Sequence, residues 1–220
     1  MSETANDLYT EWRVPPNLQR HLLTVAAVAD AVLDAWFGPP IDRNRILRVL
    51  LLHDIGNVVK SDFDNQPNLL EEEQDRIDHW KHVQAEMIDR FGKDDHVASH
   101  RIAEIIGLSR DELALLDAKI FIKNDLTRES TDYELKLAAY ADQRVAPHGV
   151  MGLLDRLSEA KERYRDKPGS SMNNPRTDLL IECAVAIENQ LRQYMRINPD
   201  SITQDTLSDR IATLRHFRFE

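Results

Sequence analysis

Apolar residues recur at steps of three and four positions along nearly every long segment of the chain, whereas strict alternation of apolar and polar residues is rare. This spacing places apolar side chains on one face of an α-helix. We therefore predict an all-α fold. The helices are expected over residues 17–37, 42–54, 69–91, 94–106, 111–122, 131–145, 151–165, 177–197 and 201–217.

Two polar stretches interrupt this pattern. Residues 60–68 predict a loop, the kind of segment that carries functional residues on a rigid scaffold. Residues 166–176, DKPGSSMNNPR, have the Pro, Gly, Ser and Asn content of a connector. We predict a domain over 1–165, this connector, and a helical C-terminal appendage over 177–220 that packs on the same globule.

Composition excludes several classes of function. The 28 basic and 38 acidic residues give a net charge of −10, which argues against a protein that neutralises the backbone of a nucleic acid polymer. The N-terminus has no basic segment followed by an apolar one, and no apolar run approaches the roughly 20 residues of a membrane span. The single cysteine, Cys183, cannot form an internal disulfide and is interpreted as a small core residue. We expect a cytoplasmic protein without a membrane partner.

The most apolar run of the chain contains an ionisable pair. The segment ILRVLLLHDIGNVV, from Ile46 to Val59, includes His53 and Asp54. Burial of such a pair costs several kcal/mol unless the two groups are hydrogen-bonded, paired or bound to a metal. Their position therefore indicates a compensating partner.

Two further polar residues share apolar helix faces. His21 lies on the stripe of the helix predicted over 17–37, and Asp142 shares a face with apolar residues of the helix over 131–145. A buried aspartate is rare unless it is paired. Two His and two Asp form a donor set for a divalent transition metal. The alternative is that each finds its own partner, as a core histidine bonded to a carbonyl would.

In these residues the sequence resembles the HD-domain superfamily of metal-dependent phosphohydrolases. The matching stretches are LQRHLLTVAAVA around His21, LLHDIGN around His53 and Asp54, and AAYADQRV around Asp142. The resemblance covers residues 15–165 and implies an HD-domain helical bundle.

The resemblance also implies a site and a reaction. His21, His53, Asp54 and Asp142 would hold one divalent cation, such as Mn²⁺, Co²⁺, Ni²⁺, Fe²⁺ or Mg²⁺, with Asp54 also acting in catalysis. The expected reaction is hydrolysis of a small phosphorylated molecule, with a nucleotide as the first candidate. A non-catalytic module for ligand sensing or assembly, with a structural metal, is the alternative, and a homo-oligomer is left open.

A second metal ion is not expected. Some members of the superfamily bind it with additional histidines, for which this chain offers four candidates, but the helical phase of His82, His96 and His100 points them away from the apolar faces. This chain also has Lys123 and Asn124 where dinuclear members carry paired histidines. The histidines concerned are His79, His82, His96 and His100.

Three basic residues are candidates for binding the phosphate of a substrate. Lys60 follows the dipeptide, Arg144 follows Asp142, and Lys123 ends a buried helix. Each has a structural alternative, as a solvated or internally paired side chain. Asn57 stands where several HD hydrolases have Lys or Glu, so the proton donor is open.

Overall fold

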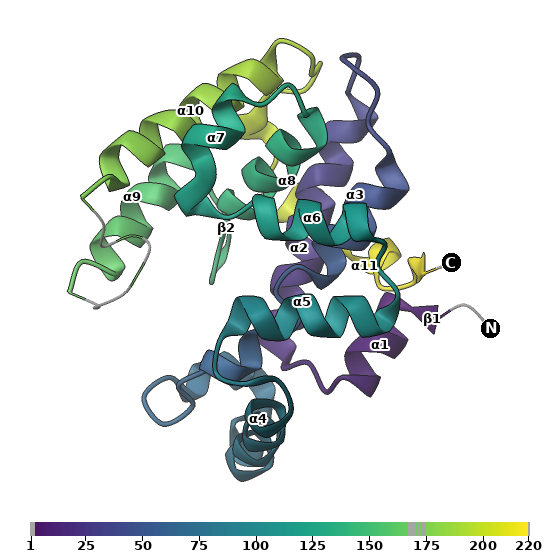
Figure 1. Ribbon diagram of the computed structural model, residues 1–220, viewed down its shortest axis with the longest axis vertical. Coiled ribbons are helices and arrows are strands. Elements are labelled where there is room, and N and C mark those ends of the chain that lie inside the picture. Colours follow the sequence, from purple (N-terminus) through teal and green to yellow (C-terminus); the bar gives the residue numbers. More distant parts are fainter. Residues whose placement is uncertain (1–2, 167–169, 171, 173–174, 220) are drawn as a thin grey trace.

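The longest helix that the structure describes, α2, lies at the centre of the molecule (Figure 1). The computed structural model describes residues 3–166, 170, 172 and 175–219. Most of the α2 side chains are buried, as expected of an apolar stripe that faces neighbours on several sides. The elements around it are α3, which packs along it, and α8 and α11, which also contact it. Their bounds are α2 Pro16–Asp34, α3 Arg43–Leu52, α8 Tyr133–Gln143 and α11 Ser208–Leu214.

The described part of the chain is helical apart from short strands, so the predicted all-α fold is confirmed. The other α-helices are α1 Ala5–Glu11, α4 Ile77–Phe91, α5 Asp95–Ile106, α6 Arg110–Ala118, α7 Asn124–Glu129, α9 Leu153–Arg163 and α10 Thr177–Arg192. The 3₁₀ helices are η1 Asn57–Lys60, η2 Pro67–Arg76, η3 Phe121–Lys123, η4 Pro199–Ser201 and η5 Asp205–Leu207. Antiparallel pairs join β1 Glu3–Thr4 to β4 Arg218–Phe219, and β2 Val145–Ala146 to β3 Gly149–Val150.

The predicted helix over 69–91 is wrong in its first part. The α-helix begins only at Ile77, after the 3₁₀ helix η2. Glu71 has a φ of 52°, a backbone conformation that residues other than glycine rarely adopt. Its carboxylate forms an ion pair with Arg20 of α2 at 2.6 Å, so a contact between elements competes with the local helical pattern.

The predicted helix over 111–122 is also too long. Helix α6 ends at Ala118, and the chain continues into η3 and a further helix, α7, that the periodicity does not predict. The reason lies in a buried polar pair, because the Asn124 amide exchanges hydrogen bonds of 2.8 and 2.9 Å with that of Gln143 in α8. Such a tertiary contact leaves no trace in the pattern of apolar residues.

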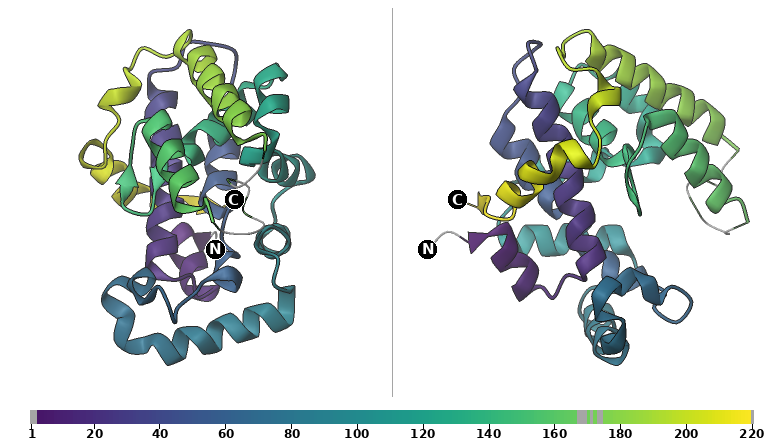
Figure 2. Two further views of the ribbon diagram at one scale, coloured as in Figure 1. Left: turned by 90° about the vertical axis from the view of Figure 1, so that its left-hand side faces the viewer. Right: turned by 180° about the vertical axis from the view of Figure 1, so that it is seen from behind.

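The C-terminal elements pack on the helices that precede them. Helix α10 contacts α7, α8 and α9, and α11 lies across α2, as Figure 2 shows from behind. Arg210 of α11 forms ion pairs with Asp30, at 2.6 Å, and Asp34, at 2.5 Å, both in α2. The division into a domain and an appendage remains a prediction. Of the predicted connector, residues 167–169, 171, 173 and 174 lie outside the described part.

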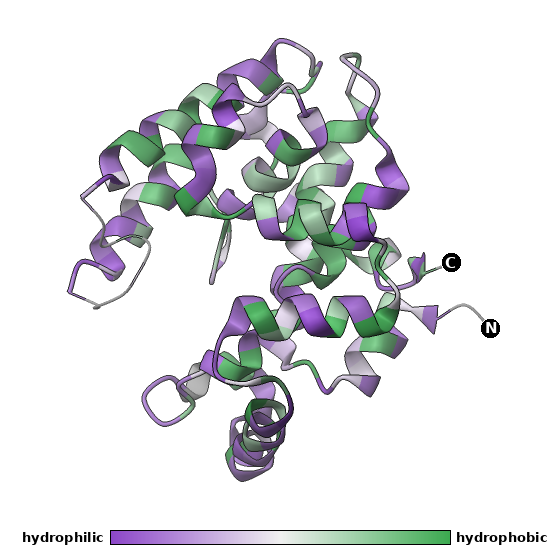
Figure 3. Cartoon of the chain, in the orientation of Figure 1, coloured by the Kyte–Doolittle hydropathy of each residue, from purple (hydrophilic) through white to green (hydrophobic). Residues whose placement is uncertain are grey.

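Apolar residues concentrate on the central helices, whereas the peripheral helix α4 is mostly hydrophilic (Figure 3). The buried core extends from Leu8 of α1 to Leu214 of α11. None of the described helices combines the length and apolar character that crossing a membrane requires.

Candidate metal centre

The His53–Asp54 pair lies where α3 ends and the chain turns sharply. His53 is the C-cap residue of α3 and its side chain is completely buried. The N–H of Gly56 donates to Oγ of Ser99 in α5 at 3.0 Å. A Cβ atom at position 56 would lie 2.5 Å from the backbone N of Ser99, so the close contact with α5 requires glycine. This contact fixes the turn that carries the pair.

Three residues from separate elements meet beside this turn. Nε2 of His21, in α2, lies 3.6 Å from Oδ1 of Asp142, in α8, and Nε2 of His53 lies 3.3 Å from the same oxygen. The two imidazole centroids are 5.2 Å apart. In the described residues this is the one group of three or more His, Cys, Asp or Glu that could hold a metal ion.

Asp54 completes the set of four predicted ligands. Its Oδ2 lies 3.9 Å from Nε2 of His21 and 3.8 Å from Nε2 of His53. Nδ2 of Asn57 donates a hydrogen bond of 2.6 Å to the same oxygen. The structure thus brings His21, His53, Asp54 and Asp142 together, and Asn57 orients Asp54.

The hydrogen bonding of His53 tests whether a cation fits this place. Nδ1 of His53 lies 2.7 Å from the carbonyl oxygen of Leu50, which only accepts, so we assign the ring proton to Nδ1. Nε2 is buried and makes no well-directed hydrogen bond. In neutral His53 its lone pair therefore faces the carboxylate of Asp142. Two acceptors at this distance fit a cation between them, with a carbonyl fixing the imidazole as is usual for a metal ligand.

Lys119, at the end of α6, is a residue of this site that sequence reasoning missed. Its Nζ donates to Oδ2 of Asp142 at 3.0 Å, and its side chain is 4% exposed. Burial raises the pKa of Asp142, but Lys119 and, when its ring is protonated, His53 lower it more, so that it lies well below its ordinary value. A lysine inside the apolar run ALLDAKIFI, residues 114–122, was the signal available in the sequence.

The same charges act on Asp54. Burial raises the pKa of Asp54, but His53 when its ring is protonated, Lys119 and Lys60 lower it to about 2 against the opposing charge of Asp142. Asp54 is therefore ionised at neutral pH.

Lys60 is the predicted phosphate-binding residue that lies near the cluster. Its ammonium forms an ion pair with Asp95 of α5. Burial lowers the pKa of Lys60, but Asp54 and Asp95 raise it more. The side chain is 52% exposed, so it stands at the rim of the site with its charge within range of Asp54.

Arg156 of α9 is a second basic group at this rim, although its sequence context resembles an exposed helical charge. Its Nε donates to the carbonyl of Val145 at 2.9 Å, and its side chain is 17% exposed. Burial and Arg163 lower the pKa of Arg156, whereas Asp142 raises it. The guanidinium is thus within electrostatic range of Asp142.

Arg144 has a structural role in place of the predicted phosphate contact. The residue is 2% exposed, and its guanidinium donates to the hydroxyl of Tyr140 and to the carbonyls of Met151, Pro199 and Ile202. The residue shares α8's end with Asp142 but points away from it, as a two-residue step on a helix dictates. Arg144 joins α8 to the C-terminal segment.

Lys123 is likewise held away from the cluster. Its Nζ donates to the carbonyl oxygen of Asp117 at 2.9 Å, near the C-terminal end of α6. Helix α6 ends at Ala118 and not at residue 122, so Lys123 lies at the end of the 3₁₀ helix η3, with its ammonium bound to the end of α6. Lys119 is the one that reaches Asp142.

Three of the four additional histidines contact residues outside the cluster. His82 pairs with Glu86 at 3.1 Å, His100 pairs with Asp117 at 3.0 Å, and the ring of His79 packs against that of Trp80. His96 is exposed. A single metal ion stays a prediction.

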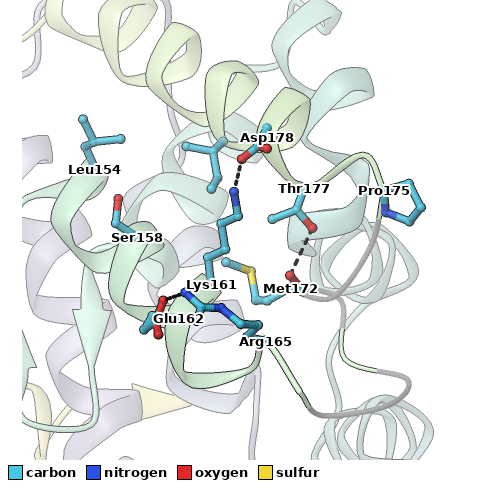
Figure 4. Close-up of a pocket in the computed structure, with 10 residues that line it drawn as sticks. Leu154, Ser158, Lys161, Glu162, Arg165, Met172, Pro175, Thr177 and Asp178 are labelled. Atoms are coloured by element: carbon cyan, nitrogen blue, oxygen red, sulfur yellow. Dashed lines mark hydrogen bonds and ion pairs between the residues drawn. The ribbon is translucent and has the colours of Figure 1, made fainter.

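A cavity of about 580 Å³ lies between α9 and α10 (Figure 4). Its lining includes none of the four predicted ligands. Its basic side chains are paired locally, Lys161 with Asp178 and Arg165 with Glu162. The His and Asp cluster, and not this cavity, is therefore the candidate metal centre.

Comparison with known proteins places this cluster in a family. Searches of curated proteins and of solved structures found no match. The family described as HD domain matches residues 18–146, which is more than half of the chain and includes all four predicted ligands. This protein therefore belongs to the HD-domain family.

Proposed function

We propose that this protein is a metal-dependent phosphohydrolase acting on a small phosphorylated molecule, and that His21, His53, Asp54 and Asp142 hold one divalent cation. The contact between two acceptors, Nε2 of His53 and Oδ1 of Asp142 at 3.3 Å, carries the proposal. HD-domain membership supports the reaction class. We propose a nucleotide as the first substrate to test, and Mn²⁺, Co²⁺, Ni²⁺, Fe²⁺ or Mg²⁺ as the ion.

Different residues of the chain would position the metal ligands and orient the attacking water. When bound, a divalent cation lowers the pKa of water and polarises a phosphoryl oxygen. The Leu50 carbonyl fixes the ring of His53, and the Asn57 amide holds Oδ2 of Asp54. Asp54 stays ionised and can accept a hydrogen bond from the attacking water, which orients it for attack.

Binding of the phosphate is proposed for two basic side chains at the rim. Lys60 and Arg156 lie within electrostatic range of Asp54 and Asp142 respectively. A phosphate that approaches the cluster would therefore meet the positive charge of both side chains. This local charge offsets the repulsion between an anionic substrate and a chain of net charge −10.

A non-catalytic sensing or assembly module is the second candidate function. The observation in its favour is Asn57, whose amide contacts Asp54 at 2.6 Å but cannot deliver a proton to a leaving group. In such a module the metal would stabilise the helical domain.

Two further properties belong to the proposal. The partner is a small molecule and not a nucleic acid polymer, because the net charge is −10. The compartment is the cytoplasm, where the single, buried Cys183 stays reduced.

Turnover measurements separate the two candidates. The wild-type protein is assayed with nucleotides and an aryl phosphate, with each of Mn²⁺, Co²⁺, Ni²⁺ and Mg²⁺ in turn. Phosphate release with at least one pair is expected, and Asp54→Ala should abolish it while circular dichroism shows unchanged helicity. A metal-loaded protein that is inert towards every ester would favour the sensing module.

A further inference from the structure

Lys60 lies at the end of a short 3₁₀ helix, η1, whose backbone is bound by a side chain of α4. Resting on the proposed binding of phosphate by Lys60, we propose that Gln84 of α4 is a positioning residue for substrate binding. Its amide fixes the backbone on both sides of Lys60, so that the ammonium stays at the rim of the centre. Gln84 thus acts through Lys60 and does not itself contact substrate.

The amide of Gln84 binds carbonyl groups on both sides of Lys60. Its Nε2 donates to the carbonyl oxygen of Val58 at 2.9 Å and to that of Ser61 at 2.7 Å. The same nitrogen lies 3.5 Å from the carbonyl oxygen of Val59. One side chain from an element further along the chain therefore determines the path of the backbone from residue 58 to residue 61.

A 3₁₀ helix of four residues needs such a partner. The hydrogen bonds of a 3₁₀ helix are less well aligned than those of an α-helix, and its last carbonyl groups have no partner within the helix. The backbone bond at this end, from the N–H of Ser61 to the carbonyl oxygen of Val58, is 3.2 Å long. Without the Gln84 amide, the carbonyl group of Ser61 would lose its partner, and the neighbouring Lys60 would gain conformational freedom.

The ammonium of Lys60 is held by a second element. It forms an ion pair with Asp95, in the first turn of α5, whose side chain is 20% exposed. An ammonium has three donors, so the ion pair leaves donors for a phosphate. Because α4 fixes the backbone and α5 the ammonium, Lys60 is in place before substrate arrives, and less conformational entropy is lost when phosphate binds. Loss of the Gln84 amide should therefore weaken the binding of phosphate.

Binding of inorganic phosphate tests the inference. Its dissociation constant is measured by isothermal titration calorimetry on protein that has been loaded with Mn²⁺ and freed of excess ion. The variants are Gln84→Met, which keeps the length of the side chain but removes the donor, Lys60→Met, and the combination of both. Gln190→Met is the matched control, because Nε2 of Gln190 also donates to a carbonyl, that of Arg128 at 3.2 Å, but joins α10 to α7. Circular dichroism checks that each variant folds, and Gln84→Ala replaces Gln84→Met if the latter does not.

We expect Lys60→Met to weaken the binding of phosphate by about tenfold or more, since a charge-assisted hydrogen bond is lost. Gln84→Met should weaken it by about threefold to fivefold when Lys60 is present and not at all beside Lys60→Met, because the two residues act through one interaction. Gln190→Met should bind phosphate as the wild type does.

Equal losses from Gln84→Met with and without Lys60 would show a general effect on the fold and overturn the inference. So would an unchanged phosphate affinity in Gln84→Met or Lys60→Met, or an equal loss in Gln190→Met. A wild type that binds no phosphate also overturns the inference. Turnover then decides the proposed function separately, because release of phosphate from an ester leaves that function standing, whereas no turnover with any ester and metal contradicts it.

Discussion

Nε2 of His53 faces Oδ1 of Asp142 at 3.3 Å, while Nδ1 of the same ring is bound to the carbonyl of Leu50. The end of α3 and helix α8 are thus brought together through two atoms that both accept hydrogen bonds while His53 is neutral, so a proton or a metal ion between them stabilises the contact. We therefore expect the metal-free protein to be less stable than the metal-bound protein, because an ion that binds only the folded state stabilises it. This expectation underlies the account of the site.

Gly56 is predicted to be essential for the turn after the dipeptide. Gly56→Ala should lower the free energy of unfolding by about 1 to 3 kcal/mol, because the new Cβ would overlap the backbone of Ser99 and neither segment yields easily. Chemical denaturation measures the change. Gly152→Ala is the control, because its Cβ would meet chiefly the mobile carboxylate of Asp155 at 3.0 Å. Equal losses in the two variants would contradict the role given to the contact with α5.

The ion pair between α3 and α6 should make stability depend on pH. Burial raises the pKa of Glu112, but the Ser109 N–H and Arg48 lower it more, so that it lies below its ordinary value of 4.5. The stabilisation is therefore fully present above pH 4.5 and is lost as the pH falls through the lower value of the folded state.

Glu112→Gln should lower the free energy of unfolding at pH 7 by about 1 to 3 kcal/mol. The difference in free energy of unfolding between variant and wild type should shrink below pH 4.5. There Glu112 of the wild type is protonated in the unfolded state and becomes protonated in the folded state as the pH falls further, so it carries no more charge than glutamine. Urea unfolding at a series of pH values tests this. Glu104→Gln, at an exposed position, serves as the control. A loss that is independent of pH would show that the charge of Glu112 does not contribute.

Arg144 is predicted to act in folding and not in substrate binding. Arg144→Lys keeps the charge but supplies three donors from one atom, so it cannot reach Tyr140, Met151, Pro199 and Ile202 together. We expect a loss of about 2 to 4 kcal/mol in stability. The KM for substrate should be unchanged at temperatures where the variant is folded. A raised KM with an unchanged melting temperature would contradict this prediction and indicate that Arg144 binds substrate.

Much of the fold, and the meeting of His21, His53, Asp54 and Asp142 at one place, could be predicted from the sequence for a physical reason. The stripes around His21 and Asp142 have the helical period, and both residues break an otherwise apolar face. A polar side chain in such a place must meet a partner, so phase alone pointed the two residues inward. The N-caps of α3 and α6, Asp42 and Ser109, accept hydrogen bonds from the backbone of Arg45 and Glu112, as residues of these types commonly do.

The errors arose where tertiary contacts override local pattern. Helix α6 ends at Ala118, so Lys119 and not Lys123 reaches the site. Arg144 is drawn to carbonyls of a segment far along the chain, which no local signal reveals. The position of Arg156 near Asp142 depends on how the chain connects α8 to α9, and helical periodicity does not specify that connection.

Metal binding by Asp142 tests the central claim most directly. Metal-free wild-type protein is titrated with Mn²⁺, and bound ion and melting temperature are measured on one preparation, together with Asp142→Asn. We predict one Mn²⁺ per chain and a raised melting temperature for the wild type. Asp142→Asn keeps the shape but loses the charge, so its affinity should fall by a factor on the order of 100. An unchanged Mn²⁺ affinity with only a lowered melting temperature would contradict the account, because Asp142 would then be a structural carboxylate.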